Sequence, residues 1–226
     1  MKIGVLFSGG KDSVFTTYYC LQQGWDVRCL ITLKSKNQAS YMFHVPNIDI
    51  TKYQAKALEI PILYQETRGE KEKELQDLKR ALQTAQKKYG IEGLAVGALA
   101  SDYQHERVNR ICHELNLKCF APLWHKPQEK LLREMIDAGF EIILSAVAAE
   151  GFSEKWLGRK IDHDALKELK GLHEKYGVSI GGEGGEYESL VLNGPIFRKR
   201  LVIKAAEKKM DGERSGVYEI KKVILT

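Results

Sequence analysis

The chain has 226 residues and a formal net charge of +5, and its residues are 43% hydrophobic and 29% charged. This length accommodates one large domain, or one domain with a small appendage, and the composition is ordinary for a soluble globular protein. Apolar stretches fall short of the roughly 20 residues that a membrane helix needs, and the apolar start is too short for a signal peptide, so we expect a cytoplasmic protein without a membrane partner.

The charge pattern and the cysteines argue against a nucleic-acid-binding surface and a zinc site. The basic residues do not form a block of five or six, so the sequence does not predict binding to a nucleic acid. The four cysteines are Cys20, Cys29, Cys112 and Cys119. Their spacing is not that of a zinc knuckle, and we interpret them as structural thiols.

Up to about residue 150, apolar strand-like runs alternate with helical patterns. Strands are predicted at residues 2–7, 27–33, 60–64, 94–99, 118–121 and 141–147. Helices are predicted at residues 14–23, 51–59, 70–89, 102–115 and 131–138. Because strands that alternate with helices form parallel sheets covered on both faces, we predict an α/β fold with a Rossmann-like sheet in an ATP-binding domain of residues 1–150.

The pattern changes in the last third of the chain. A helix is predicted at residues 162–176, followed by a glycine-rich acidic segment and short strands at residues 190–192, 201–204 and 217–225. We interpret residues 151–226 as a smaller C-terminal substrate-binding lobe that packs against the carboxyl edge of the sheet.

The segment between the first strand and the first helix has the composition of a phosphate-binding loop. It consists of Ser8, Gly9, Gly10, Lys11, Asp12 and Ser13. The first turn of a helix offers free backbone N–H groups and the positive end of the helix dipole, and glycines let a phosphate approach them closely. The carboxylate of Asp12 indicates a magnesium ion or a helix cap. The Walker A spacing is not met, because Lys11 does not directly follow Gly9.

A second constellation of charged residues lies in the glycine-rich segment. Three carboxylates occur within six residues, at Glu183, Glu186 and Glu188. Like charges this close raise one another's pKa unless a cation lies between them. The segment therefore favours a site for magnesium, an ammonium group or a trimethylammonium group, and a solvated acidic loop is the alternative.

These two motifs carry a resemblance to known families. Ser-Gly-Gly-x-Asp-Ser after the first strand resembles the signature of the PP-loop ATP pyrophosphatases, which implies a five-stranded Rossmann-like core and cleavage of ATP to AMP and pyrophosphate. Together with residues 182–189 and 193–195, the sequence resembles the diphthine–ammonia ligase family over about residues 1–200. Further matching pieces are residues 97–104, 122–124 and 156–159. Ser189 stands where threonine is usual, which keeps the hydroxyl.

The resemblance implies the last step of diphthamide synthesis. Members of the family adenylate the carboxylate of diphthine, a modified histidine of translation elongation factor 2 that bears a trimethylammonium group, and ammonia then displaces AMP. ATP and Mg²⁺ would be the cofactors, and the elongation factor and ammonium the partners. Glu183 and Glu186 would hold the trimethylammonium group or orient ammonia, with Glu188 beside them, and Tyr103 would add a cation–π face.

Further candidate residues lie where strands end or helices begin. Tyr103 and Gln104 open a helix at the carboxyl end of a strand, where open α/β sheets bind ligands, and a plain helix start is the alternative. Thr32 ends the second strand, a usual place for adenosine contacts. The resemblance adds His44 and Glu70 as substrate-binding candidates, although a solvated histidine and a carboxylate that answers the helix dipole are the simpler interpretations.

Two other functions stay open at this point. A PP-loop tRNA-modifying enzyme, or another ATP pyrophosphatase, would share the loop, although the scattered cysteines do not suit thiolation. A nucleotide-binding regulator would share it too, but would not need clustered carboxylates near a phosphate. The source of the ammonia and the oligomeric state, a homo-oligomer included, are not readable from the sequence.

Overall fold

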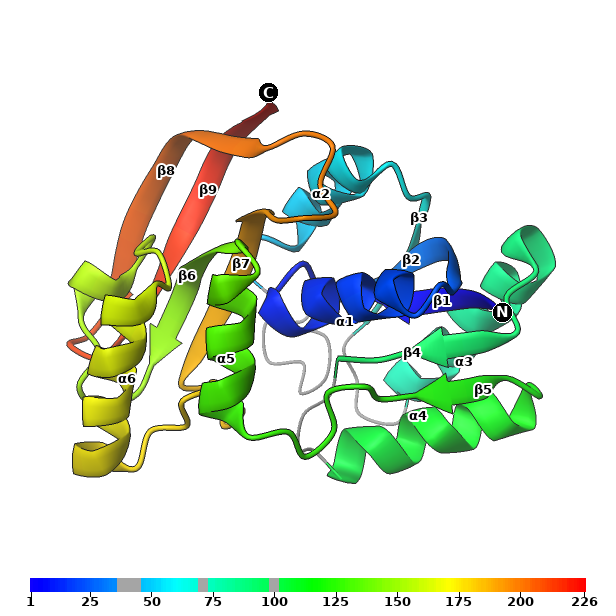
Figure 1. Cartoon of the computed structure of the whole chain (residues 1–226), viewed down its shortest axis with the longest axis horizontal. Helices are drawn as coiled ribbons and strands as arrows, with labels where there is room; N and C mark the ends of the chain where they lie inside the picture. The colour runs from blue at the N-terminus through cyan, green and yellow to red at the C-terminus, as the bar shows by residue number, and fades with distance from the viewer. Residues whose placement is uncertain (36–45, 69–72, 98–101) are drawn as a thin grey trace.

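The computed structural model describes residues 1–35, 46–68, 73–97 and 102–226, and it places two β-sheets next to each other (Figure 1). The first sheet has five strands in the order β3-β2-β1-β4-β5, and the second has four strands in the order β7-β6-β9-β8. All pairs in the first sheet are parallel, and all pairs in the second are antiparallel. The predicted α/β class with a Rossmann-like parallel sheet is confirmed.

The first sheet follows the predicted alternation of strands and helices. Its strands are β1 (Lys2–Leu6), β2 (Asp26–Ser35), β3 (Ile62–Thr67), β4 (Gly93–Ala95) and β5 (Lys118–Phe120). The connecting helices are α1 (Lys11–Gln22), the 3-10 turn η1 (Ile48–Ile50), α2 (Thr51–Leu58), α3 (Lys73–Tyr89) and α4 (Asp102–Glu114). Since β1 pairs with both β2 and β4, the strand order reverses beside β1, and open α/β sheets bind ligands at the carboxyl end of such a switch point.

Helices cover both faces of this sheet because its strands are apolar on both sides. Val5 and Leu30 belong to one core cluster, together with Val14 of α1 and Ala55 of α2. The alternate residues of β2, such as Ile31, belong to a second cluster that α3 and α4 cover. Successive side chains of a strand point to opposite faces, so continuous apolar runs are what a sheet buried on both sides requires.

The second sheet is covered on both faces: the helices that follow α4 in the chain lie on one face, and Ala57 of α2 packs against the other. Its strands are β6 (Glu141–Ala148), β7 (Tyr187–Asn193), β8 (Leu201–Asp211) and β9 (Ser215–Leu225). Helix α5 (Gln128–Asp137) precedes β6, and the 3-10 turn η2 (Glu154–Trp156) and helix α6 (His163–Tyr176) follow it. Strands β8 and β9 form a long hairpin that the sequence pattern predicts only in part, as residues 201–204 and 217–225.

The division between the sheets does not fall at residue 150, where the sequence pattern changes. Strand β6 lies before that position, yet it pairs with β7 and β9 of the second sheet. Its apolar sequence suits a buried strand of either sheet, so the pattern alone does not reveal its partners.

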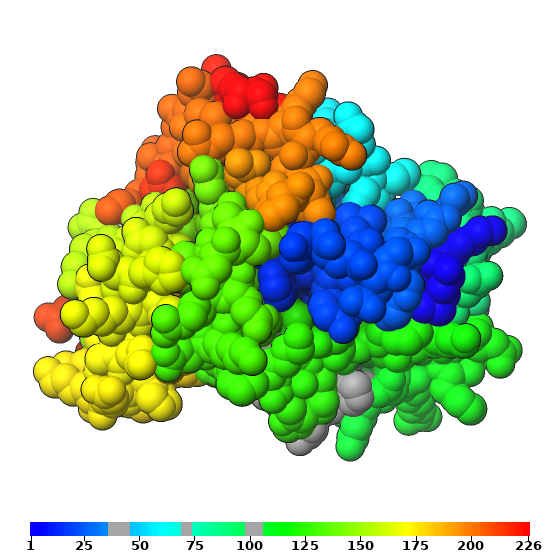
Figure 2. All heavy atoms as spheres, in the orientation of Figure 1, coloured from blue at the N-terminus to red at the C-terminus, as the bar shows by residue number. Residues whose placement is uncertain are grey.

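One apolar core joins the two sheets. The cluster that contains Val5 and Val14 continues through Leu132 of α5, Ile142 of β6 and Val191 of β7. Figure 2 shows the blue N-terminal residues in contact with the orange residues that follow β7 on this face of the molecule. The N-terminal part of the chain therefore packs directly on the second sheet.

Candidate active site

Residues 8–13 form a tight loop that connects β1 to α1. Gly9 has a φ of +81°, in the left-handed region that glycine enters without steric cost. The hydroxyl of Ser13 accepts hydrogen bonds from the backbone N–H of Gly9 at 3.1 Å and of Ser8 at 3.3 Å, and donates to the carbonyl of Gly10 at 3.1 Å. Ser13 thus closes the loop on itself. Helix α1 begins at Lys11, three residues before the predicted start, because the loop supplies its first turn.

Lys11 and Asp12 form a buried ion pair in this loop. The Lys11 side chain is only 5% exposed, and its Nζ lies 2.6 Å from Oδ2 of Asp12 and 5.7 Å from the centre of the Tyr187 ring. Burial lowers the pKa of Lys11, but the carboxylate of Asp12 and the Tyr187 hydroxyl outweigh it, and the pKa lies above its usual range. Within the described residues, the buried Oδ1 of Asp12 has no hydrogen-bond partner, so it is available to a ligand.

Strand β7 bonds directly to the loop. The hydroxyl of Ser189 accepts the backbone N–H of Lys11 at 3.1 Å and so satisfies a first-turn amide of α1. The N–H of Val191 donates to the carbonyl of Gly9 at 3.1 Å. The strand that follows the acidic segment therefore contributes to the shape of residues 8–13, the predicted nucleotide loop.

Gln54 of α2 is a site residue that the sequence motifs do not reveal. Its side chain is fully buried, and its Nε2 donates to the carbonyls of Gly9 and Val191, both at 2.8 Å. A signal does exist in the sequence. Thr51, Gln54, Ala55 and Leu58 follow the spacing of one helix face, so a glutamine stands where an apolar core residue is expected.

Gly97, two residues after the end of β4, packs against the first turn of α1. A Cβ atom at this position would lie 2.8 Å from the carbonyl carbon of Asp12 and 2.9 Å from the backbone nitrogen of Ser13. Real side chains do not tolerate such distances to backbone atoms. The absence of a side chain at Gly97 is therefore what lets β4 and α1 meet beside the loop.

The acidic segment folds into a tight loop ahead of β7. Gly182 and Gly185 both have positive φ angles, +73° and +82°. The two carboxylate oxygens of Glu186 accept the backbone N–H groups of Ser179, at 2.9 Å, and Gly184, at 2.8 Å. Glu186 therefore holds the segment in shape. The catalytic role of Glu186 stays a prediction.

Glu183 and Glu188 have a different environment. The pKa of Glu188 is raised to about 7, mainly because its half-buried carboxylate is desolvated, and Asp12 raises it further against the opposing charge of Lys11. The pKa of Glu183 is also raised to about 7, by desolvation and then by Asp12. Glu183 keeps a solvent-exposed surface, so water screens its charge more than that of Glu188.

The electrostatic balance of the site favours a cation. Besides desolvation, the carboxylate of Asp12 raises the pKa of both Glu183 and Glu188, and the positive charge of Lys11 opposes this. Bringing a positively charged ligand group between Glu183 and Glu188 would lower both pKa values towards the usual range. Among the described residues, no group of three or more His, Cys, Asp or Glu side chains forms a ready-made metal centre. A magnesium ion here would need oxygen ligands from a bound nucleotide, as is usual for this ion.

Five further residues were predicted to belong to the site, and the structure describes the side chain of one of them, Thr32. Thr32 is fully buried and donates its hydroxyl to the carbonyl of Phe7 at 2.7 Å, which ties β2 to the end of β1. His44 and Glu70 lie outside the described residues. Tyr103 and Gln104 lie in the first turn of α4, as expected, but their side chains are outside the described part of the structure. The roles of these five residues stay predictions.

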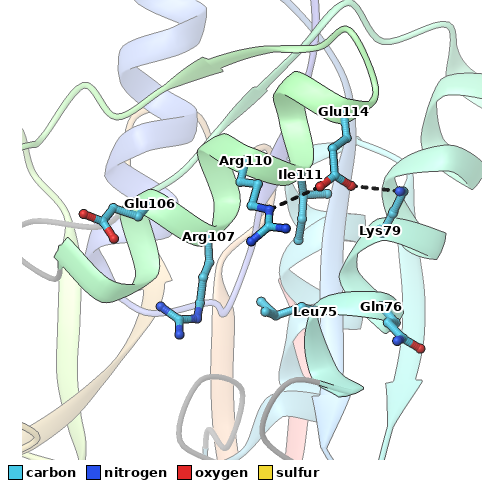
Figure 3. A pocket seen from close by; sticks show the side chains of 8 residues that line it. All are labelled: Leu75, Gln76, Lys79, Glu106, Arg107, Arg110, Ile111 and Glu114. Atoms are coloured by element: carbon cyan, nitrogen blue, oxygen red, sulfur yellow. Dashed lines mark hydrogen bonds and ion pairs between the residues drawn. The ribbon is translucent and has the colours of Figure 1, made fainter.

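A cavity of about 510 Å³ lies elsewhere, between α3 and α4 (Figure 3). Figure 3 shows Glu114 of α4 facing Lys79 of α3 and Arg110, at distances of 2.8 Å and 3.4 Å. The lining residues are Leu75, Gln76, Lys79, Glu106, Arg107, Arg110, Ile111 and Glu114. Among these described residues, none belongs to the loop of residues 8–13.

A search of the described helices finds none with the length and apolar character to span a membrane.

Comparison with known proteins gives matches over nearly the whole chain. Residues 1–119 match the diphthamide synthase N-terminal domain, and residues 127–226 match the diphthamide synthase C-terminal domain. A diphthine–ammonia ligase of Bos taurus is 35% identical, with 92% of this chain and 84% of the relative covered. One of Schizosaccharomyces pombe is 34% identical, with 90% of this chain and 36% of that longer relative covered.

Two solved structures are more distant. A predicted subunit of a tRNA methyltransferase from Methanocaldococcus jannaschii has a TM-score of 0.45 and 17% identity, covering 86% of this chain and 98% of its own. A U34-tRNA thiolase from Methanococcus maripaludis has a TM-score of 0.40 and 14% identity, covering 82% of this chain and 70% of its own.

Proposed function

The chain belongs to the diphthamide synthase family, and on that premise we propose that it is an ATP-dependent diphthine–ammonia ligase. It would convert diphthine on translation elongation factor 2 to diphthamide, using ammonium and releasing AMP and pyrophosphate. The observation that carries the proposal is the junction of the two motifs. The phosphate-binding loop is hydrogen-bonded to β7 through Lys11 and Ser189, and β7 begins within the acidic segment.

The loop is suited to hold the phosphates of ATP. The positive end of the α1 helix dipole, the hydroxyl of Ser8 and the charge of Lys11 all favour an anion. Asp12 fits a magnesium ion, because its buried Oδ1 has no protein partner among the described residues. When bound with ATP, the ion would neutralise phosphate charge. Thr32 is proposed to lie near the adenosine.

The acidic segment is suited to hold the modified histidine. Glu183 and Glu188, ionised by the approach of a cation, would attract the trimethylammonium group, or an ammonium ion that then loses a proton to become the nucleophile. Tyr103, Gln104, His44 and Glu70 are proposed to complete the site.

Two steps make up the proposed reaction. A carboxylate oxygen of diphthine attacks the α-phosphorus of ATP and forms an acyl-adenylate, and the bond to pyrophosphate breaks. The nitrogen of ammonia then attacks the acyl carbon, AMP leaves with the bonding electron pair, and the nitrogen loses a proton. Each step forms one bond and breaks one, so ammonium, ATP and the carboxylate are the reactants required.

Product analysis tests this proposal. The protein is incubated with labelled ATP, ammonium chloride and elongation factor 2 that carries diphthine, and the nucleotides and the modified histidine are identified. We expect AMP and pyrophosphate in equal amounts, together with diphthamide. ADP as the main product would contradict the assignment of the loop. AMP formation with transfer to a tRNA, and none to the elongation factor, would instead identify a tRNA-modifying enzyme.

The matched variant for this assay is Glu183→Gln. It keeps the shape of the side chain and removes the charge. We expect ATP binding near that of the wild type, and amide formation lower by about a hundredfold, the usual scale for a positioned charged group. Full activity in this variant would exclude Glu183 from substrate binding.

A further inference from the structure

The nucleotide loop, helix α2 and strand β7 lie far apart in the chain, and they meet at the side chain of Gln54. We propose that Gln54 is a positioning residue that couples the nucleotide loop to β7, so that ATP and the modified protein substrate strengthen each other's binding. The substrate half of this inference rests on the proposed function, because it takes the acidic segment ahead of β7 to be the substrate site.

The contacts form a closed arrangement. Nε2 of Gln54 donates to the carbonyl of Gly9 in the nucleotide loop and to the carbonyl of Val191 in β7, both at 2.8 Å. The N–H of Val191 donates to that same Gly9 carbonyl, at 3.1 Å. An amide nitrogen with two hydrogens is required to bridge two carbonyls in this way.

The position of β7 in its sheet explains the need for this bridge. Strand β7 is an edge strand of the second sheet, so one side of it has backbone groups without a strand partner. At Val191 the nucleotide loop and Gln54 supply those partners. A buried carbonyl left without a partner is costly, so the loss of the Gln54 amide should disturb the position of β7 against the loop.

The fit between Gln54 and the loop is also steric. A Cβ atom at Gly9 would lie 2.2 Å from Oε1 of Gln54 and 3.0 Å from Thr51. The loop therefore takes its left-handed turn directly against the glutamine amide. A shift of α2 or β7 would move Gly9, and with it the first turn of α1 that follows the loop.

Strand β7 connects the acidic segment, the proposed substrate site, to the nucleotide loop. Tyr187, Ser189 and Val191 alternate along the strand and so share one face or edge. Tyr187 lies beside Lys11, Ser189 bonds its N–H, and Val191 bonds Gly9. A cation held by Glu183 and Glu188 would restrain this strand, and by linkage ATP in the loop would restrain the substrate site equally.

The test compares two glutamines that each donate to a backbone carbonyl. Gln54→Met keeps the length of the side chain and removes its hydrogen bonds. Gln86→Met is the control, because Nε2 of Gln86 in α3 donates to the carbonyl of Leu115 at 3.0 Å, away from the loop. Binding of a non-hydrolysable ATP analogue is titrated with and without diphthine-bearing elongation factor 2, at temperatures where melting curves show folded protein.

In the wild type and in Gln86→Met, we expect the elongation factor to tighten binding of the analogue by about fivefold or more, the lower end of usual coupling. In Gln54→Met, the analogue should bind about tenfold more weakly and the tightening should fall below about twofold. A purely structural glutamine would weaken binding or lower stability without abolishing the tightening.

Persistent tightening in folded Gln54→Met would overturn the proposal, and so would the absence of tightening in a wild type that makes diphthamide. A wild type that makes no diphthamide would refute the proposed function instead. The affinity for the ATP analogue would then be the only test of whether Gln54 positions the nucleotide loop. Equal affinities for Gln54→Met and Gln86→Met would overturn that positioning role.

If Gln54→Met does not fold, Ser189→Ala and Ser189→Thr replace it in the same titration. Threonine keeps the hydroxyl that accepts the Lys11 N–H and should preserve the tightening, whereas alanine should lose it. Equal behaviour of these two variants would likewise overturn the coupling.

Discussion

Gly97 offers a sharp test of how closely β4 and α1 are packed beside the nucleotide loop. In Gly97→Ala, the new methyl group would lie 2.8 Å and 2.9 Å from backbone atoms of Asp12 and Ser13, which cannot rotate away. The first turn of α1 must move instead. Overpacking of this kind costs about 1–3 kcal/mol, which lowers the melting temperature of a chain of this size by about 2–12 °C.

The same displacement should weaken nucleotide binding. Because the loop amides belong to the turn that moves, we expect affinity for a non-hydrolysable ATP analogue to fall about tenfold, equivalent to roughly 1.4 kcal/mol. Melting curves followed by circular dichroism and titration calorimetry measure the two effects.

Gly171→Ala is the matched control, since Gly171 lies within α6 and a Cβ there meets nothing within 4 Å. Alanine in a helix interior is favoured over glycine by about 0.5–1 kcal/mol, so this variant should melt slightly above the wild type and bind the analogue equally. Gly97→Ala with unchanged melting and unchanged affinity would refute the reasoning about the contact between β4 and α1.

Three further predictions concern charged residues of the site. Lys11→Met should weaken binding of the ATP analogue by about 10–100-fold in a titration, because a charge-assisted contact is worth roughly 1.5–3 kcal/mol, and unchanged affinity would place the phosphates elsewhere. Glu188 has a pKa raised to about 7, so the folded protein keeps a proton that the unfolded chain releases above its ordinary pKa of 4.5. Wild-type stability should therefore fall as the pH rises from about 4.5 to about 7. Glu188→Gln should melt at a higher temperature than the wild type at pH 8, and this difference should vanish towards pH 4. A difference in melting temperature that does not change with pH would argue against the raised pKa. Glu186→Gln places an NH₂ group opposite the backbone N–H of Ser179 or Gly184. Hydrogen exchange at these two backbone N–H groups should therefore accelerate, and formation of diphthamide should fall. Unchanged exchange would mean that Glu186 does not shape the segment.

Features that depend on neighbouring residues could be predicted from the sequence. The phosphate-binding loop occupies six consecutive residues between a strand and a helix, so its conformation follows from glycines, a helix start and a short connection. The parallel sheet could be predicted because its central strands β1 and β2 are apolar on both faces and strands alternate with helices along the chain. The three carboxylates within residues 183–188 were equally visible, because they lie in one short segment.

The partners of these features depend on contacts between residues far apart in the chain. Ser189 bonds the N–H of Lys11 across 178 positions, and Gln54 bonds Val191 across 137. Periodicity describes which face of an element is buried but not what covers it. It therefore wrongly placed β6 in the parallel sheet, although β6 pairs antiparallel with β7 and β9. It also gave no role to Gln54 and did not reveal that Glu186 accepts two backbone N–H groups.

Local motifs were sufficient to predict the fold class, a phosphate-binding loop and an acidic segment, because each motif carries its own backbone geometry and charge. Contacts between residues far apart in the chain were needed to show that the loop and the strand after the acidic segment are joined. An edge strand needs partners for its backbone groups, and the nucleotide loop needs acceptors for its amides. Packing β7 against the start of α1 satisfies both needs at once, through Ser189, Val191 and Gln54.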